Sequence, residues 1–406
     1  MVPEGWKVKQ LADVCSKQIS YGIVQTGEHQ PNGIPCLRVV DLTKDEMHPE
    51  KMIRTSVEIH ESYRKTILEK DEIVMALRGE VGLVRQIDTK LVGANITRGL
   101  ARISAKPQLV APEFLLWELR SPKFRADLMR RVGGSALQEI SLSELRKVQT
   151  LIPPLPEQKK IAKILSTWDK AITTTEQLLA NSQQQKKALM QQLLTGRKRL
   201  LDKNGVRFSG EWKFQSISQI SKRIQRKSDG EDHPILTISS LSGFVRQDER
   251  YSRYMAGESV KNYILLKKGE FAYNKGNSKT YEFGCIFDLD SYKSGLVPHV
   301  YVCFNLHQGL SHRYFKYLFE ADYLKPQLGA LVNTGVRNNG LLNIKPAEFM
   351  NTKVPVPCFD EQEQIADVLH ASSETINKIQ LKLDTLKQEK KALMQQLLTG
   401  KRRVLV

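Results

Sequence analysis

Polar side chains that can hydrogen-bond the edges of DNA bases gather in short, glycine-containing segments of this sequence. In the major groove, arginine reads guanine, and asparagine or glutamine reads adenine, through paired hydrogen bonds. The candidates are Tyr21, Gln25, Arg78, Asn95, Thr97 and Arg98 in the first half of the chain, and Asn274, Lys275, Asn277, Arg337, Asn338 and Asn339 in the second. The alternative is that these residues only form turns and solvated surface, because asparagine and glycine favour turns.

The overall charge points to a polyanionic partner. The formal net charge is +18 and the isoelectric point is near 9.5. A balance this basic favours double-stranded DNA or RNA over a membrane surface, because no basic amphipathic anchor helix stands out. Lys222-Arg223, Arg226-Lys227 and the segment 123–131 are expected to contact phosphates or to form solvated faces. A basic protein without a nucleic-acid role is the alternative.

No motif of an enzyme acting on DNA is complete. A phosphate-binding loop needs glycine directly before Lys279-Thr280, but Ser278 stands there. Pro153-Pro154 lacks the amide and the aromatic residue of the N-P-P-Y loop of amino-methyltransferases. The eight histidines have no metal-ligand spacing, and the five cysteines include no C-x-x-C pair. We therefore expect no catalytic residue, no bound metal and reduced, mostly buried thiols.

An internal repeat organises the chain. The sequence KKALMQQLLTG occurs at 186–196 and again at 390–400, an offset of 204 residues. The same offset places Glu157-Gln158 on Glu361-Gln362, although Cys358-Phe359-Asp360 departs from the proline-rich run before the first copy. The chain is thus a variable module and a repeated segment, followed by a second variable module and a second repeated segment.

Each repeated segment is expected to be a long helix with a heptad seam. Apolar residues recur at alternating steps of four and three, as in a coiled coil. About 39 residues per helix correspond to roughly 58 Å at 1.5 Å per residue. The expected seam residues are Ile161, Leu165, Trp168, Ile172, Leu179, Leu189, Leu193, Ile365, Leu369, Ile376, Leu383, Leu393 and Leu397.

The two seams can pair in an antiparallel coiled coil. A register that sets Ile161 against Leu397 places Trp168 beside Lys390, so that an indole accommodates one lysine of the seam. The same register places Lys186 beside Ser372. The alternative is that each helix packs only on its own module.

The variable modules are expected to be α+β domains. Short apolar segments such as EIVMAL, GLARIS, HPILTIS, EFAYN and VYVCF predict strands, and 112–119, 122–131 and 311–324 predict helices. The fold class is therefore α+β, with two recognition domains in tandem separated by two long helices. The expected boundaries are 1–156 for the first module, 157–196 for the central helix, 197–209 for a linker, 210–357 for the second module, and 358–406 for the distal helix and C-terminal tail.

This arrangement resembles the specificity subunits of type I restriction–modification systems. The resemblance rests on PPLPEQKKIAKIL, its partner PVPCFDEQEQIADVL, the duplicated KKALMQQLLTG, YGIVQTGEHQPNGIPCLRVVDL near the start and RGEVG from Arg78. It implies that each module reads one half of a bipartite DNA target. It also implies that the helices set the half-site spacing and dock two modification (methyltransferase) subunits, which restriction/translocase subunits join. S-adenosylmethionine, ATP and magnesium would then belong to those partners, and this chain would be non-catalytic.

Two other functions compete with this interpretation. A stand-alone DNA-modifying enzyme would need the missing motifs, and a coiled-coil interaction protein without a DNA role would not explain the charge. No apolar stretch approaches the roughly 20 residues of a membrane helix, and the first residues carry charges where a signal peptide is apolar. We therefore expect a cytoplasmic location and no membrane partner.

Overall fold

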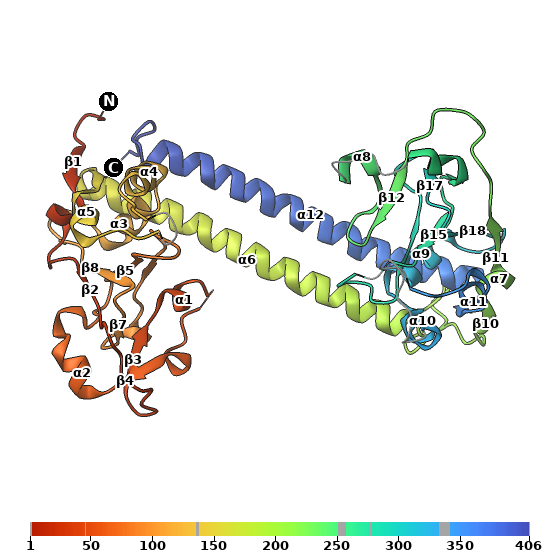
Figure 1. Ribbon diagram of the computed structural model, residues 1–406, viewed down its shortest axis with the longest axis horizontal. Coiled ribbons are helices and arrows are strands. Elements are labelled where there is room, and N and C mark those ends of the chain that lie inside the picture. Colours follow the sequence, from red (N-terminus) through yellow and green to blue (C-terminus); the bar gives the residue numbers. More distant parts are fainter. Residues whose placement is uncertain are drawn as a thin grey trace. The chain divides into compact units, whose positions relative to one another are not determined.

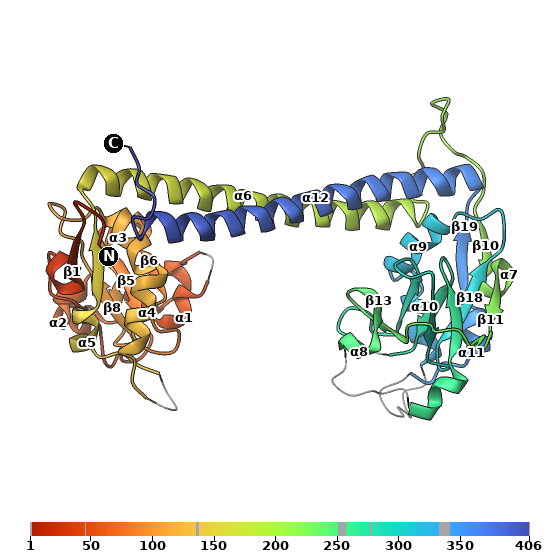
Figure 2. The ribbon, with the colours of Figure 1, turned by 90° about the horizontal axis from the view of Figure 1, so that it is seen from above.

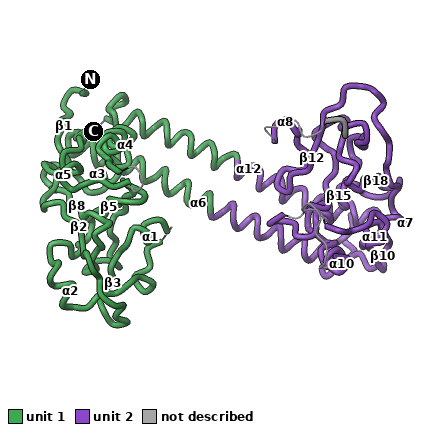
Figure 3. The backbone as a smooth tube through the Cα atoms, in the orientation of Figure 1, with its two compact units in different colours: residues 1–176, 381–406 green, residues 177–380 purple. Residues whose placement is uncertain are grey.

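The computed structural model describes residues 2–44, 46–134, 138–250, 257–276, 278–332 and 342–405. It divides into two compact units, one formed by residues 1–176 and 381–406 and the other by residues 177–380. Both long helices change unit near their midpoints (Figure 3). Each unit therefore contains one variable module, the first half of one long helix and the second half of the other.

Unit 1 is built on a four-stranded antiparallel sheet of order β2-β8-β5-β6 (Figure 1). A three-stranded sheet, β4-β3-β7, and a pair, β1-β9, lie beside it in the same unit. The strands are β1 (Lys7–Gln10), β2 (Ser20–Tyr21), β3 (Ile34–Leu37), β4 (Ile53–Thr55), β5 (Ile73–Ala76), β6 (Val84–Gln86), β7 (Asn95–Ile96), β8 (Leu100–Ile103) and β9 (Gln149–Ile152). The module helices are α1 (Val39–Leu42), α2 (Val57–Ser62), α3 (Pro112–Leu119), α4 (Pro122–Arg130) and α5 (Leu142–Lys147).

Unit 2 repeats this plan with a four-stranded sheet of order β11-β18-β15-β16. Its pairs are β10-β19, β12-β13 and β14-β17. The strands are β10 (Lys213–Ser216), β11 (Ser221–Ile224), β12 (Leu236–Ser239), β13 (Gly243–Arg246), β14 (Ile264–Lys267), β15 (Phe271–Asn274), β16 (Cys285–Asp288), β17 (Ser294–Val297), β18 (Val302–Leu306) and β19 (Lys353–Val356). The helices are α7 (Ile217–Ile220), α8 (Gln247–Arg250), α9 (His312–Glu320), α10 (Lys325–Leu331) and α11 (Pro346–Met350).

The α+β class predicted for the modules is confirmed. EIVMAL and EFAYN form β5 and β15, the equivalent inner strands of the two four-stranded sheets. The second helix predicted in each half differs from expectation only in detail. In the first half α4 ends at Arg130; in the second the helix predicted at 311–324 is α9, which ends at Glu320, and α10 follows the predicted segment as a helix that was not predicted.

The two long helices, α6 (Leu155–Leu193) and α12 (Phe359–Leu397), have 39 residues each, the predicted length (Figure 2). α6 begins at Leu155 and α12 begins at Phe359, and these two positions are related by the offset of the repeat. The sequence change at Cys358-Phe359-Asp360 therefore does not shift the start of the second helix. All the expected seam residues are buried or half-buried. The 4–3 apolar spacing therefore identified the packed face of both helices.

In unit 1 the first half of α6 packs antiparallel to the second half of α12. Ile161 and Leu165 share one core with Leu393 and Leu397. Across the same pair, Lys387 forms an ion pair with Glu176 at 2.7 Å. The antiparallel pairing predicted from the two seams is confirmed here.

The partners predicted for the lysines of the seam are wrong. Lys390 lies over the indole of Trp117, 4.8 Å from the ring centroid, and pairs with Asp169, whereas Trp168 was expected. In unit 2 the equivalent Lys186 lies 5.3 Å from the ring centroid of Tyr317 and bonds Glu320 at 2.5 Å, whereas Ser372 was expected. Both aromatic rings come from a module helix, α3 or α9. A helical register alone could not reveal these partners, because they lie outside the helix pair.

A buried glutamate at the start of each long helix joins three distant segments. In unit 1 Glu157 accepts a hydrogen bond from Trp6 Nε1 at 3.1 Å and two from Arg403, at 2.7 Å from Nε and 2.9 Å from Nη2. In unit 2 Glu361 accepts one from Trp212 Nε1 at 2.9 Å and two from Arg199, at 2.5 and 2.8 Å. We call each group a Trp–Glu–Arg clasp. The arginine comes from the C-terminal tail in unit 1 and from the segment after α6 in unit 2.

All five cysteines are free thiols. Burial raises the pKa of Cys36, Cys285 and Cys303 to about 12, so these thiols stay protonated at neutral pH. Cys358 is the exposed one, next to the start of α12. Within the described residues, no helix is both long and apolar enough to cross a membrane.

Candidate nucleic-acid interface

The strand directions of unit 1 bring most of the candidate residues of the first half to one edge of a sheet. β2 and β5 both run antiparallel to β8. The ends of β2 and β5 therefore lie at the same edge as the start of β8. Tyr21 ends β2, Arg78 follows β5, and Thr97 and Arg98 precede β8. We call this group, with Gln25 in the loop after β2, the recognition edge of unit 1.

Backbone hydrogen bonds fasten these segments to one another. Ile23 N–H donates to Ile96 O at 2.7 Å, and Arg98 N–H donates to Ile23 O at 2.8 Å. Gly22 permits this approach, because a Cβ atom there would lie 1.8 Å from Ile96 O. The strand-end loop is thus held rigidly enough to present fixed side chains.

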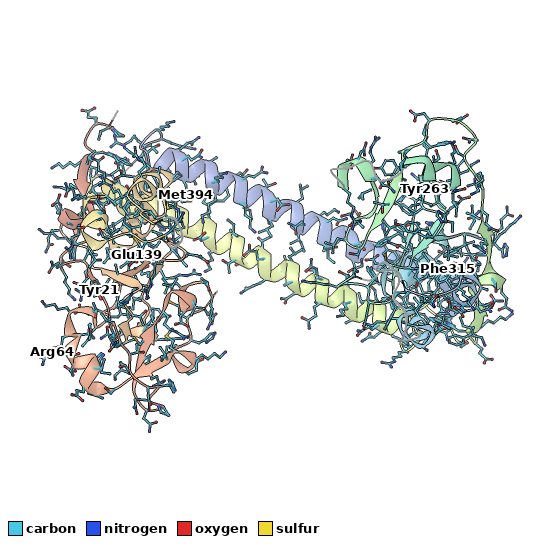
Figure 4. All side chains as sticks on the ribbon, in the orientation of Figure 1. Tyr21, Arg64, Glu139, Tyr263, Phe315 and Met394 are labelled. Atoms are coloured by element: carbon cyan, nitrogen blue, oxygen red, sulfur yellow. The ribbon has the colours of Figure 1, made fainter. Side chains whose placement is uncertain are left out.

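The side chains of the recognition edge differ in accessibility. Tyr21 is 48% exposed, and Gln25 and Arg98 are also exposed. Arg78 and Thr97 are half-buried. Arg78 also forms a β-bridge with Glu139. Figure 4 labels Glu139 and Tyr21, which both belong to the first module. Exposed hydroxyl, amide and guanidinium groups on a rigid edge can hydrogen-bond base edges and phosphates.

Asn95 does not belong to this edge. Its side chain is fully buried, its Oδ1 accepts from Thr66 Oγ1 at 2.8 Å, and its Nδ2 lies 3.3 Å from His60 Nδ1. It also occupies β7, whose pairing with β3 places it inside the module. The expectation that Asn95 contacts a base is therefore wrong in this structure. A polar residue can be buried when its hydrogen bonds are satisfied internally, and the sequence does not distinguish the two cases.

Sequence reasoning missed a polar pocket beside Tyr21. The pocket has a volume of about 360 Å³ and lies between β2 and the turn that follows α2; its lining is Ser20, Tyr21, Glu61, Ser62, Tyr63, Arg64, Lys65 and Thr66. Arg64 has a side chain that is 78% exposed. The signal was the run Tyr63-Arg64-Lys65, an aromatic residue followed by two cations, which is a common composition at nucleic-acid surfaces.

The equivalent edge of unit 2 is only partly described. β11 and β15 both run antiparallel to β18, so the ends of β11 and β15 again share an edge with the start of β18. Asn274 ends β15 and is half-buried, and its Oδ1 accepts from Gly276 N–H at 3.0 Å. Burial and the nearby Arg223 lower the pKa of Lys275. The other candidates of this half, Asn277, Arg337, Asn338 and Asn339, lie outside the described residues.

One cluster in unit 2 has the residue types of a cation site. Ligand atoms of Asp229, Glu231 and His233 lie within 4.8 Å of one another. However, His233 Nε2 bonds Asp229 Oδ1 at 2.7 Å and its Nδ1 bonds Ser294 Oγ at 2.9 Å. Both ring nitrogens thus have protein partners, and the histidine fastens this loop to β17.

One carboxyl group in each module has a strongly raised pKa. Burial raises the pKa of Glu118 on α3 to about 8, although Leu151 N–H donates to its Oε1 at 2.8 Å. Burial likewise raises the pKa of Asp322, between α9 and α10, to about 6. Glu118 also has the Ser121 hydroxyl as a hydrogen-bond partner, and Lys325 lies near Asp322.

Fold and candidate site together define a tandem-repeat protein with one candidate binding edge in each of two units. A family model described as "Type I restriction modification DNA specificity domain" matches residues 3–181. The specificity subunit of the EcoBI type I restriction enzyme of Escherichia coli is 26% identical over 196 residues, 48% of this chain and 41% of that protein. The chain thus spans less than half of that relative. A putative MjaX specificity subunit of Methanocaldococcus jannaschii is 24% identical over 99% of this chain and 95% of its own length.

Solved structures show the same fold along the whole chain. The HsdS subunit of Thermoanaerobacter tengcongensis superposes with a TM-score of 0.52 at 15% identity, covering 99% of this chain and 98% of that one. The type I restriction–modification S subunit of M. genitalium gives 0.56 at 12% identity, covering 98% and 99%. Residues 3–181 thus resemble the type I restriction–modification DNA specificity domain, and the solved structures show that the similarity in fold extends along the whole chain.

Proposed function

We propose that this chain is the sequence-reading subunit of a type I restriction–modification complex and reads a bipartite DNA target with one module for each half. The observation that supports it most is the pair of equivalent sheet edges with different side chains. One edge offers Tyr21, Arg78 and Arg98, and the other offers Asn274 and Lys275. Equivalent positions with different donors and acceptors select different bases, so the two half-sites differ in sequence.

The long helices act as the spacer and as the dock for partner subunits. α6 and α12 each run from one unit into the other, so lengthening both helices is expected to lengthen the spacer between the two half-sites of the DNA target. Two methyltransferase subunits bind the helices, and restriction/translocase subunits join the assembly. S-adenosylmethionine, ATP and magnesium are used by those partners, and this chain directs their activity without catalysing a reaction itself.

Genome-wide methylation mapping tests the proposal. Cells that carry the intact gene and its partner genes are expected to methylate a two-part motif, and deletion of this gene is expected to remove that motif completely. Arg78→Ala is expected to weaken the preference for one base at one position of one half-site. A paired arginine–guanine contact contributes about 1–3 kcal/mol of discrimination against the wrong base. Asn274→Ala is expected to affect only the other half-site.

Arg130→Ala is the matched control, because Arg130 is an exposed arginine on α4 with a surface ion pair to Asp127, and a phosphate contact from this position would carry no sequence information. It is expected to leave both half-sites unchanged. Methylation of the motif in the absence of this chain would refute the proposal. Methylation by the purified chain alone would refute the non-catalytic role.

A further inference from the structure

A pocket in unit 1 collects positive charge where the end of α3 meets α6 and α12. Its volume is about 320 Å³, and Met394, labelled in Figure 4, contributes to its lining from α12. The charged residues of the lining are Arg120, Asp169, Lys387, Lys390 and Lys391. Four cations against one carboxylate leave an excess of three positive charges. We call this site the basic pocket.

Two cations of the basic pocket share a single carboxylate. Arg120 Nη1 lies 3.8 Å from Asp169 Oδ2, and Lys390 pairs with Oδ1 of the same group. Both cations also lie over the indole of Trp117, at 5.1 and 4.8 Å from the ring centroid. One carboxylate neutralises only one of them. Burial lowers the pKa of Arg120, so an anion in the pocket would stabilise its charged form.

The module helices α3 and α9 are equivalent, which allows the basic pocket to be compared with the same place in unit 2. The residue before each helix, Ala111 or Ser311, donates its N–H to a glutamine in the first turn of α6 or α12. These matching contacts set an offset of 200 residues between the two module helices. Arg120 therefore corresponds to Glu320.

The corresponding place in unit 2 has much less positive charge. The counterparts of the five charged residues are Glu320, Gln183, Lys186, Lys187 and Ser373. Their net charge is +1, compared with +3 in unit 1. Glu320 accepts a hydrogen bond from Lys186 at 2.5 Å, so the lysine that lies over an aromatic ring there already has its own carboxylate. The charge excess is thus a property of unit 1.

The basic pocket borders the recognition edge of unit 1. Arg120 Nη2 donates to Val84 O at 3.4 Å, and Arg125 Nη1 donates to Gly82 O at 3.0 Å. β6 pairs antiparallel with β5. The turn between these strands, which contains Arg78, therefore lies at the recognition edge. Positive charge continues from this edge into the pocket.

We propose that the basic pocket binds a phosphate of the DNA backbone beside the half-site that unit 1 reads, and that the corresponding place in unit 2 does not. This inference rests on the proposed function, because it adds a contact to the module that reads one half-site. A phosphate contact positions a protein on DNA without selecting bases. Arg120 and the lysines of α12 would hold the two half-sites unequally, whatever their sequences are.

The salt dependence of DNA binding tests the inference. Binding of the full chain to duplex DNA of random sequence is measured by fluorescence anisotropy at several salt concentrations. Each phosphate contact contributes about 0.9 to the slope of log K against log salt concentration. Lys391→Gln changes an exposed residue and is expected to make the slope shallower by about 0.9. Binding at 0.1 M salt should weaken about eightfold.

Lys187→Gln is the matched control. Lys187 is exposed and lies in the same eleven-residue sequence as Lys391, but its unit has Glu320 in place of Arg120. The control is expected to keep the slope of the native chain. Equal slopes for the Lys391→Gln and Lys187→Gln variants would overturn the phosphate site.

Arg120→Glu gives unit 1 the charge that unit 2 has at this position, and it should also make the slope shallower. Lys106→Glu makes the same change of charge at an exposed residue that follows the end of β8, at the opposite edge of the sheet. It is expected to alter the slope less than Arg120→Glu does, and an equal effect would contradict the phosphate site. A native chain that does not bind duplex DNA would instead overturn the proposed function.

Discussion

The Trp–Glu–Arg clasp of unit 1 provides a test of how the C-terminal tail stabilises the first module. Arg403→Ala removes two charge-assisted hydrogen bonds from Glu157, whose side chain is only 2% exposed. Hydrogen bonds to charged groups contribute about 1.5–3 kcal/mol. The Arg403 side chain is 45% exposed, so solvent screening reduces what these hydrogen bonds contribute.

The equivalent change in unit 2 is expected to cost more. The Arg199 side chain is 21% exposed and also donates to Gly210 O at 2.9 Å. We therefore expect Arg199→Ala to destabilise unit 2 by about 3 kcal/mol, because less solvent competes for the buried carboxylate. Trp212 would remain as the one hydrogen-bond donor of the clasp to Glu361.

Hydrogen–deuterium exchange of the full chain measures each unit separately. β1, which follows Trp6, reports on unit 1, and β10, which follows Trp212, reports on unit 2. A loss of about 3 kcal/mol in unit 2 corresponds to roughly 150-fold faster exchange where opening of that unit controls exchange, and a smaller increase is expected in unit 1. Arg402→Ala and Lys198→Ala, at exposed neighbouring positions, serve as controls and should leave exchange unchanged. If Arg403→Ala and Arg402→Ala gave the same exchange in β1, the clasp would not stabilise unit 1.

Three further predictions concern the helices and the core. Glu118 has a folded-state pKa of about 8 against an ordinary value of 4.5. The stabilisation that the protonated Glu118 contributes is therefore fully present below about pH 4.5 and is lost as the pH rises through 8. Glu118→Gln should flatten the dependence of the melting temperature on pH, whereas Glu113→Gln at an exposed position should not. Cysteines in place of Leu165 and Leu393 should crosslink under oxidation, and failure to do so would contradict the antiparallel packing in unit 1. Insertion of seven residues after Glu176, and of seven more after position 380, keeps the heptad pattern and lengthens each helix by about 10.5 Å. Methylation mapping should then show a DNA target whose two half-sites lie about three base pairs further apart.

The long helices could be predicted because the pattern of residues that specifies each helix lies within one continuous segment of the chain. Burial of one face of a helix imposes a 4–3 recurrence of apolar residues, so the seam could be read from Ile161 to Leu397. The inner strands β5 and β15 were equally visible as short apolar runs. The repeat then showed that both halves share one architecture.

The candidate binding edge was less predictable, because it depends on how separate segments meet. Polar residues after strands are visible in the sequence, but pairing of β2, β8 and β5 decided that Tyr21, Arg78 and Arg98 share an edge. The same folding buried Asn95 and added Arg64 from a turn that no motif had marked. Local composition does not distinguish a satisfied buried amide from an exposed one.

The sequence by itself determined the tandem α+β plan, the length and packed face of both long helices, and the basic character of the chain. Tertiary structure alone decided the partners of the buried charges. Glu157 is separated by 151 residues from Trp6 and by 246 from Arg403, and Lys390 finds its indole on α3 and not on α6. Such contacts leave no periodic pattern in the sequence. They form because segments that meet only in the folded chain bury a charged group, and a buried charge needs a partner.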